Sequence, residues 1–176
     1  YRLSTKVHDS MVAVRKEVEM LDAYMSLMCY RYSDIIYRSE IEPGALDIEI
    51  PNFILQPLLE NSLMHGLKDR RYQGTIILKI YRNEQDKNEL NIWLIDDGIG
   101  IPDDKMAELN AYNAKDSEAL YRVQTRTEGD RTHLGVINVI SRLKLYYQEN
   151  AEVIYMRNET GGTTVKIKIK TASEET

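Results

Sequence analysis

The segment from Thr163 to Lys170 limits the possible folds more than any other part of the chain. It reads Thr-Thr-Val-Lys-Ile-Lys-Ile-Lys, so aliphatic residues and lysines alternate strictly. Successive side chains of a β-strand point to opposite faces of its sheet. One face of this sheet is therefore apolar and covered, whereas the other presents lysines to water. The alternation predicts a sheet with a single covering layer.

Four other segments have the composition of strands. Two of them are joined by the polar residues 83–88, which are typical of a hairpin, so we expect them to be antiparallel neighbours. Another follows the turn sequence Glu42-Pro43-Gly44. The predicted strands are 46–50, 75–82, 90–95, 153–157 and 163–170.

Helical periodicity predicts three helices. In residues 136–147 apolar side chains recur at spacings of three and four, which is typical of a helix that packs one side on a core. Residues 56–66 form a second helix, with Pro57 tolerated in its first turn and Gly66 as its expected end. Residues 5–31 carry a heptad-like apolar stripe. That stripe fits a helix packed on its own domain and also part of a helical dimer stalk, and the sequence alone does not distinguish the two.

The order of these elements defines the fold class. It is helix, strand, helix, two strands, a polar segment, helix and two strands. We therefore expect an α+β fold, a two-layer α/β sandwich in which helices cover one face of a mixed sheet, with an N-terminal helix added. The polar segment, residues 103–134, is rich in Asp, Glu and Arg and has poor periodicity. A segment of this kind is a functional lid or is disordered.

The composition excludes several classes of function. The 176 residues, 43% of them hydrophobic, can bury one substantial core. The net charge of −5 argues against a general nucleic-acid binder. The single cysteine, Cys29, rules out a disulfide framework and lies in an apolar stretch, as a core thiol does. No apolar run approaches the ~18 residues of a membrane span. Because the chain starts at Tyr1, we expect a fragment of a longer protein, cytosolic in character.

The predicted helix 56–66 carries a polar pair, Glu60-Asn61, among leucines. Asparagine is a modest helix former at best, so its place in the middle of a helix needs a reason. Its amide oxygen can complete the octahedral shell of Mg²⁺, whose other ligands are phosphate oxygens and waters. At helical spacing Asn61, His65 and Lys68 share one face of the helix. For this segment taken alone, an ordinary exposed asparagine is the alternative.

The predicted strand 90–95 runs into Asp96-Asp97-Gly98-Ile99-Gly100. A carboxylate at the end of a buried strand can accept hydrogen bonds from an amino-substituted ring. Glycine has no Cβ, so a ligand can lie against the backbone at Gly98 and Gly100. Asp-Gly is also a common hairpin turn, which is the alternative for this segment alone. Combined with the helix, the segment predicts a pocket for a magnesium nucleotide.

Other signatures of nucleotide and metal sites are missing from the sequence. The chain has no GxxxxGK[ST] phosphate loop, and Asp103 stands where a dinucleotide-binding fold has its third glycine. No Cys/His cluster has zinc spacing, and no G-x-S-x-G elbow presents a nucleophile. A nucleotide site in this chain is therefore expected from the helix and the strand end described above.

Several segments in order resemble a known family, the ATP-binding domains of sensor histidine kinases. This family belongs to the gyrase/Hsp90/histidine kinase/MutL superfamily, which has a Bergerat-type fold. Within this family, the motif sequences are similar to those of the LytS/YesM type, and the resemblance spans nearly the whole chain. The matching segments are 55–66 (N box), 96–100 (G1 box), 133–147 (G2 box) and 161–167 (final Gly-Thr strand), together with 17–24, Arg31-Tyr32 and Ile50-Pro51.

The resemblance implies a role for each candidate site residue. Asn61 coordinates Mg²⁺, and Asp96 accepts the amine of adenine. Residues 103–134 are an ATP lid. The other implied contacts are Gly98 and Gly100 beneath the base, Gly135 and Asn138 at the end of the lid, Thr163 in support of Asp96 (directly or through water), and one of Arg122, Arg126 or Arg131 at the phosphates.

The resemblance also implies a longer, homodimeric and membrane-anchored parent, of which this chain is a cytoplasmic portion. Residues 1–38 correspond to the end of the dimerisation and phosphoacceptor region with its connecting helix, and residues 39–176 to the ATP-binding catalytic domain. The domain binds MgATP and donates the γ-phosphate to a histidine N-terminal to this chain. The parent relays this phosphate to the receiver domain of a response regulator, and no nucleic-acid partner is implied.

The chain departs from the family pattern at three places. Lysine is common three residues after the N-box asparagine, where this chain has Met64, so His65 or Lys68 is left to supply a phosphate cation. His133 stands where a second glycine often precedes the G2 box. The Pro-His-Phe phosphoacceptor motif is missing, because His8 lacks those neighbours.

Two other functions stay open at this point. A nucleotide-binding or signalling module without kinase activity is compatible with Met64. An ATP hydrolase of the gyrase or Hsp90 kind has a general-base glutamate one turn before the asparagine; here Pro57 occupies that position, which argues against hydrolysis. In the kinase, Glu60 orients or deprotonates the attacking imidazole, with a solvated helix acid as its alternative.

Overall fold

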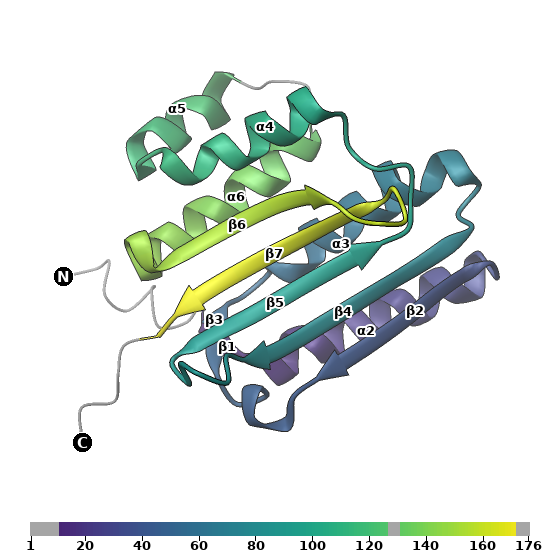
Figure 1. Ribbon diagram of the computed structural model, residues 1–176, viewed down its shortest axis with the longest axis horizontal. Coiled ribbons are helices and arrows are strands. Elements are labelled where there is room, and N and C mark those ends of the chain that lie inside the picture. Colours follow the sequence, from purple (N-terminus) through teal and green to yellow (C-terminus); the bar gives the residue numbers. More distant parts are fainter. Residues whose placement is uncertain (1–10, 127–130, 172–176) are drawn as a thin grey trace.

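The computed structural model describes residues 11–126 and 131–171 (Figure 1). Its main sheet has five strands in the order β2-β4-β5-β7-β6. β2 is parallel to β4 and all other neighbours are antiparallel, so the sheet is mixed, as expected. The strands are β2 (Ile35–Ile41), β4 (Gly74–Arg82), β5 (Glu89–Asp96), β6 (Ala151–Arg157) and β7 (Thr163–Lys170).

Three helices cover one face of this sheet, and two more lie at its β6 edge (Figure 1). A small second sheet joins β1 to β3. The two-layer sandwich predicted from the alternation in the last strand is confirmed. The remaining elements are β1 (Met11–Ala13), β3 (Glu49–Pro51), the covering helices α2 (Val14–Arg31), α3 (Leu55–Asn61) and α6 (Arg131–Tyr147), the edge helices α4 (Asp103–Ala111) and α5 (Ser117–Arg126), and the 3₁₀ turns Pro43–Ala45, Lys68–Arg70, Tyr112–Ala114 and Gln148–Asn150.

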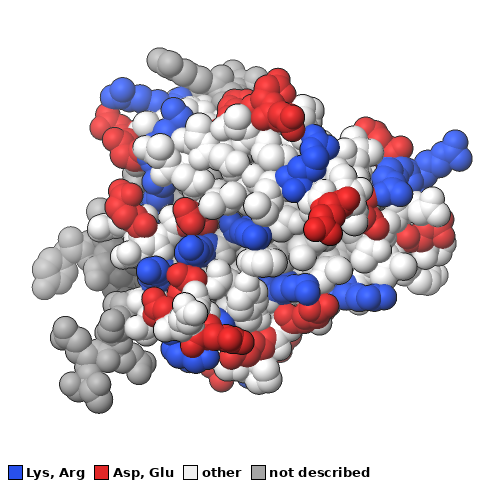
Figure 2. All heavy atoms as spheres, viewed as in Figure 1, with Lys and Arg blue, Asp and Glu red and all other residues white. Residues whose placement is uncertain are grey.

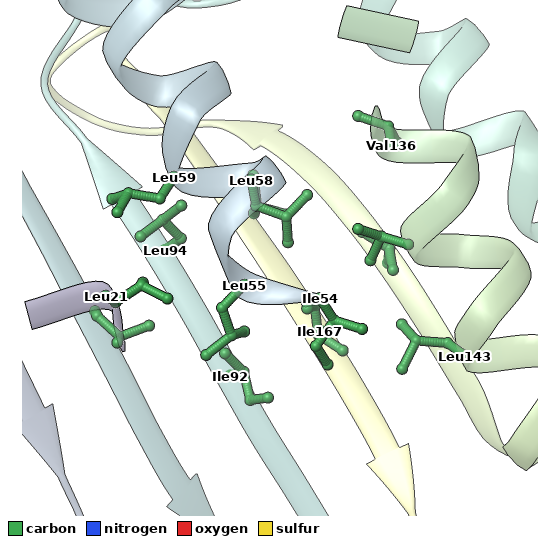
Figure 3. Close-up of a cluster of buried hydrophobic side chains, with 14 of the residues drawn as sticks. Leu21, Ile54, Leu55, Leu58, Leu59, Ile92, Leu94, Val136, Leu143 and Ile167 are labelled. Atoms are coloured by element: carbon green, nitrogen blue, oxygen red, sulfur yellow. The ribbon is translucent and has the colours of Figure 1, made fainter. Parts of the chain in front are cut away.

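The hydrophobic core fills the space between the sheet and the covering helices (Figure 3). Each layer supplies its predicted apolar side to a single cluster of buried side chains. Removing this apolar surface from water is the main force that holds the helices on the sheet. Figure 3 labels Leu21 of α2, Leu55, Leu58 and Leu59 of α3, Ile92 and Leu94 of β5, Val136 and Leu143 of α6, and Ile167 of β7.

Within residues 11–126 and 131–171 no helix lies on the opposite face of the sheet, and this face is polar, as the lysine alternation predicts. Positive side chains (lysine and arginine) and negative side chains (aspartate and glutamate) are interspersed over it (Figure 2). The ammonium group of Lys166 on β7 lies 4.0 Å from the centre of the Trp93 ring on β5, a cation–π contact. Within the described residues, no helix is long and apolar enough to span a membrane.

The heptad-like stripe belongs to a helix that packs on its own domain. Val14, Val18, Leu21 and Met25 of α2 are all buried in the common core. Of the two interpretations of this stripe, the structure supports the first for the residues it describes. The helix begins at Val14, not earlier, because residues 11–13 pair with β3 as a strand. The expected helical residues 5–10 lie outside the described part of the chain.

Strand β2 was not predicted. Only its first residue, Ile35, is buried, because the strand lies at the edge of the sheet. It therefore lacks the regular apolar alternation that identifies a strand in the sequence. The domain boundary expected between residues 38 and 39 falls inside this strand. The predicted strand at 46–50 is shorter and later than expected, because residues 43–45 form a 3₁₀ turn and only residues 49–51 pair with β1.

The polar segment 103–134, for which we expected a functional lid or disorder, is largely helical where it is described. Two asparagines fix its first part to the free edge of β6. The Asn110 side chain accepts the backbone N–H of Tyr155 (2.7 Å) and donates to its carbonyl oxygen (2.9 Å). Asn113 makes the same pair with Val153, at 2.9 and 2.6 Å. The two amides thus act as a short additional strand, and we refer to them as the asparagine ladder.

Candidate functional site

A cleft of about 800 Å³ opens beside the end of β5. The end of α3 and the turns that follow it form one wall, which carries Asn61, His65 and Lys68. We refer to it as the α3 wall. Asp96 and Thr163, at the adjoining ends of β5 and β7, form its base. Leu109 of α4, Val136 of α6 and Tyr155 of β6 close the far side. The cleft therefore joins the two segments that the sequence singled out.

The helix that carries Asn61 does not end at Gly66, contrary to our expectation. Residues 62–67 continue it as a π-helical turn, in which each N–H bonds five residues back. A methyl group on Gly98 would lie 2.5 Å from the Gly66 carbonyl group, so the two backbones touch. The Ile99 N–H donates to the Gly66 carbonyl oxygen at 3.1 Å. Gly66 therefore marks a close approach of helix and strand end, which explains a glycine there without a helix stop.

Asp96 lies at the bottom of the cleft and is 2% exposed. Its Oδ1 accepts the backbone N–H of Gly98 (3.0 Å) and that of Thr163 (3.2 Å). Burial raises the pKa of the Asp96 carboxyl above its ordinary value, while hydrogen bonds from Thr163, Gly98 and the Ser62 hydroxyl oppose this effect. Thr163 thus contacts Asp96 directly, and it does so through its main chain.

The neighbouring acid, Asp97, points elsewhere. Its Oδ1 accepts the backbone N–H of Thr75 at 2.8 Å, which ties the end of β5 to the start of β4. Its side chain also forms an ion pair with Arg70, at 3.8 Å. Of the two consecutive acids, Asp96 faces the cleft and Asp97 holds the sheet together.

The α3 wall of the cleft carries the polar residues that the sequence predicted on this helix. Asn61 and Glu60 are half-buried and both line the cleft, and His65 and Lys68 line it as exposed side chains. The Glu60 carboxylate accepts the Gln56 amide N–H at 3.0 Å. Met64, which stands in place of the usual lysine, is 45% exposed at the same wall.

Not every predicted residue lies in the wall of the cleft. Gly100 lines it, whereas Gly98 lies behind Asp96. Gly135 and Asn138 do not line it, because α6 turns Val136 toward the cleft instead. Arg122 is exposed on α5, where it pairs with Glu118 at 2.5 Å, and does not line the cleft. His8 and the side chains of Arg126, Arg131 and His133 lie outside the described part of the chain.

The structure adds residues that the sequence did not single out. Ser62 is 6% exposed and its hydroxyl bonds Asp96. Ser62 could have been identified from the sequence as a polar residue next to Asn61 in a helix that is otherwise largely apolar. Tyr155 and Leu109 come from β6 and α4, and nothing in their local sequence separates them from ordinary core residues.

These residues fit a magnesium nucleotide by the chemistry of their donors. Among the described residues no three His, Cys, Asp or Glu side chains converge on a metal position. A hard cation in this cleft therefore requires oxygen ligands from a bound phosphate chain, in addition to the Asn61 amide oxygen. The buried carboxylate of Asp96 provides the acceptor for a ring amine at the other end.

Comparison with known proteins identifies the family of this chain. A sequence model of the family described as "Histidine kinase-, DNA gyrase B-, and HSP90-like ATPase" matches residues 47–173. The sensor protein LytS of Oceanobacillus iheyensis is 34% identical over 159 residues, which are 90% of this chain and 25% of that protein. The sensor histidine kinase YpdA of Escherichia coli is 25% identical over 92% of this chain and 25% of its own length. The chain thus spans about a quarter of these relatives.

Solved structures share the fold. The nucleotide-free catalytic domain of the histidine kinase ThkA has a TM-score of 0.63 at 11% identity, covering 92% of this chain and 96% of that domain. The histidine kinase domain of the blue-light activated kinase from Erythrobacter litoralis EL346 has a TM-score of 0.58 at 19% identity, covering 90% and 61%. From the family match, the LytS relatives and the shared fold, we conclude that the chain belongs to the histidine kinase-, DNA gyrase B- and HSP90-like ATPases, as an ATP-binding domain of the kind found in LytS-type sensor kinases.

Proposed function

We propose that this chain binds MgATP and is the catalytic part of a sensor histidine kinase, which donates the γ-phosphate to a histidine elsewhere in the parent protein. The observation that carries the proposal is that Asp96 and Asn61 line one cleft, the first buried at its base and the second on the wall formed by α3. An adenine ring and a magnesium-bound phosphate chain need these two kinds of group within one cavity.

At the base of the cleft, Asp96 selects the base. Its ionised carboxylate only accepts hydrogen bonds, so it pairs with an exocyclic amine. Adenine carries such an amine at C6, where guanine carries a carbonyl oxygen. Two acceptors facing each other in a buried site leave both unpaired, which is costly. We therefore expect ATP to bind better than GTP.

At the α3 wall of the cleft, the side chains bind the metal and the negatively charged phosphates. Asn61 offers an oxygen ligand to the metal, and Lys68 and His65 offer cations or hydrogen-bond donors to the phosphates. Bound Mg²⁺ neutralises phosphate charge during phosphoryl transfer, which needs positioning more than covalent chemistry from the protein. Glu60 lies beside Asn61 and orients or deprotonates the incoming imidazole.

Two other functions are less well supported. A hydrolase needs a base to activate water one turn before Asn61, and Pro57 has no such group. A module that has lost turnover is compatible with Met64, which offers no charge to the phosphates. The first is tested by ATP hydrolysis, and the second by the affinity for MgATP.

The proposal is tested by isothermal titration calorimetry with MgATP, ATP in EDTA, and MgGTP. We expect MgATP to bind more tightly than the other two. In Asp96→Asn the amide oxygen is held by the N–H groups of Gly98 and Thr163, so an NH₂ group replaces the other oxygen, the acceptor for the base, and the variant is expected to abolish binding. Asp97→Asn, which keeps an oxygen for the Thr75 N–H, is the matched control and is expected to bind normally. Normal binding by Asp96→Asn, or none by the unaltered protein, would exclude the proposed site.

The parent-level functions follow from the same proposal. LytS relatives are named as sensor proteins. We propose a homodimeric, membrane-anchored parent with this domain in the cytoplasm, which passes phosphate to the receiver domain of a response regulator. Transfer of ³²P from ATP to the regulator by the full-length parent, and its loss in Asn61→Ala, is the corresponding test.

A further inference from the structure

A buried tyrosine hydroxyl in the cleft has no partner. Tyr155 lies on β6, is 3% exposed, and lines the cleft together with Asn61. Its hydroxyl oxygen is inaccessible to water and makes no hydrogen bond with any residue in the described ranges. Phenylalanine would fill the same volume without leaving a polar group unsatisfied. A buried polar group of this kind needs an explanation.

The backbone of Tyr155 is fixed on both sides of β6. The Asn110 amide bonds both the N–H and the carbonyl oxygen of Tyr155 on one side of β6, and β7 pairs with the strand on the other, with Val165 opposite. The strand is therefore fixed, and the ring itself is packed in the buried core. The partner for the hydroxyl is to be sought among the side chains that line the cleft.

The side chain placed to do so is that of Asn61. Burial raises the pKa of the Tyr155 hydroxyl, and the Asn61 amide lowers it in part, as a nearby N–H donor does. Both side chains line the cleft, and the amide and the hydroxyl are not hydrogen-bonded to each other. The half-buried Asn61 side chain is thus the donor whose N–H can turn to the hydroxyl.

This contact decides which end of the amide faces the metal. An asparagine side chain carries an oxygen acceptor at one end and an NH₂ donor at the other, and the two orientations have nearly the same shape. We propose that Tyr155 is a positioning residue: its hydroxyl oxygen accepts an N–H from Asn61 and so turns the amide oxygen toward the magnesium position. The inference rests on the proposed function and adds to it a residue that fixes the metal ligand.

The expected effect is on magnesium rather than on the base. Tyr155→Phe leaves the adenine end of the cleft intact, so affinity for ATP in EDTA should not change. The amide of Asn61 then samples both orientations, so only about half of the molecules present its oxygen to the metal, and the increase in ATP affinity that Mg²⁺ produces should fall about twofold. Titration of ATP at a series of Mg²⁺ concentrations measures this increase directly.

Tyr112→Phe is the matched control. Tyr112 is 4% exposed and its hydroxyl donates to Glu108 at 3.2 Å, away from the cleft. Removing that bonded hydroxyl should lower the melting temperature of the ligand-free protein and leave the effect of Mg²⁺ unchanged. Tyr155→Phe should give the reverse: an unchanged or higher melting temperature without ligand, because an unsatisfied group is removed, and a weaker effect of Mg²⁺.

The outcomes separate this inference from the function on which it rests. If Tyr155→Phe lowers the ligand-free melting temperature as Tyr112→Phe does, and keeps the full effect of Mg²⁺, the hydroxyl is only structural and the inference is wrong while MgATP binding stands. If the unaltered protein does not bind MgATP, both fail together. A reduced Mg²⁺ effect with unchanged affinity in EDTA supports the positioning role.

Discussion

The carboxylate of Glu17 accepts the backbone N–H of Phe53 at 2.6 Å, across two elements 36 residues apart in the chain. Phe53 has a positive φ of 55°, which is unusual for a residue with a side chain, and a second bond from the Leu55 N–H (3.3 Å) secures the same turn. Glu17 is 1% exposed on α2. Helix α2 thus holds the start of α3, the helix that ends at Asn61.

Glu17→Ala is expected to destabilise the protein by about 1–3 kcal/mol, because it leaves the N–H groups of Phe53 and Leu55 without their acceptor in a buried site. Urea unfolding measures the change in the free energy of unfolding. The matched control is Glu19→Ala, which removes an exposed acid from the same helix and should have little effect. Equal effects of the two substitutions would refute this account of the turn.

The asparagine ladder gives a prediction about the edge of the sheet. Asn110→Ala leaves the N–H and carbonyl of Tyr155 unpaired on β6 and is expected to cost about 1–3 kcal/mol. Amide hydrogen exchange should accelerate at Tyr155, while the amide of Ile167 on the interior strand β7 serves as the internal reference. An exposed strand edge also favours pairing between copies, so self-association should increase. Unchanged exchange at Tyr155 would mean that the ladder contributes nothing.

The raised pKa of Asp96 predicts how stability depends on pH. Burial puts its folded pKa above the unfolded value of 3.8, so its contribution to stability is fully present below that pH and is lost as the pH rises through the folded pKa. Asp96→Asn stays neutral throughout. The ligand-free variant should therefore gain stability relative to the original protein as the pH rises from about 4 through the folded pKa of Asp96. Urea unfolding at a series of pH values tests this, and a variant that becomes relatively less stable toward neutral pH would contradict it.

Met64 allows a gain of function to be predicted. It is partly exposed on the wall that carries Asn61, so Met64→Lys places an ammonium group at the phosphate end of the cleft. One charge-assisted hydrogen bond to a phosphate is worth about 1.4 kcal/mol, so MgATP affinity should rise about tenfold. Met64→Gln, similar in length but neutral, is the control. The gain should shrink at high salt, and equal affinities for the lysine and glutamine variants would show that no phosphate lies there.

The sequence predicted the layers of the fold and the two ends of the cleft because these depend on local patterns. The alternation in β7 and the leucines around Asn61 each follow the period of their element, and Asp96 is marked by the glycines after it. The helices within residues 103–134 were not predicted, since α4 is only weakly amphipathic and is held by side-chain to backbone bonds with β6. Such bonds join residues far apart in sequence and leave no periodic signal.

Within the site, too, residues marked by their local sequence could be predicted, and residues placed by distant contacts could not. Asn61 and Asp96 could be chosen from their surroundings, whereas Tyr155 could not, because its place depends on how β6 packs at the sheet edge. The end of α3 was misplaced for a related reason. A glycine is a common helix stop, but Gly66 is needed for the approach of Gly98, a contact that exists only once helix and strand meet.

The asparagine ladder has an entropic consequence for the wall of the cleft. Because Asn110 and Asn113 bond to the backbone of β6, α4 is tethered to the edge of the sheet. The closure entropy of a loop grows with the logarithm of its length, and each halving of a loop lowers this cost by about 0.6 kcal/mol. A tether within the long connection from β5 to β6 thus lowers the entropy lost when α4, whose Leu109 lines the cleft, is held in place.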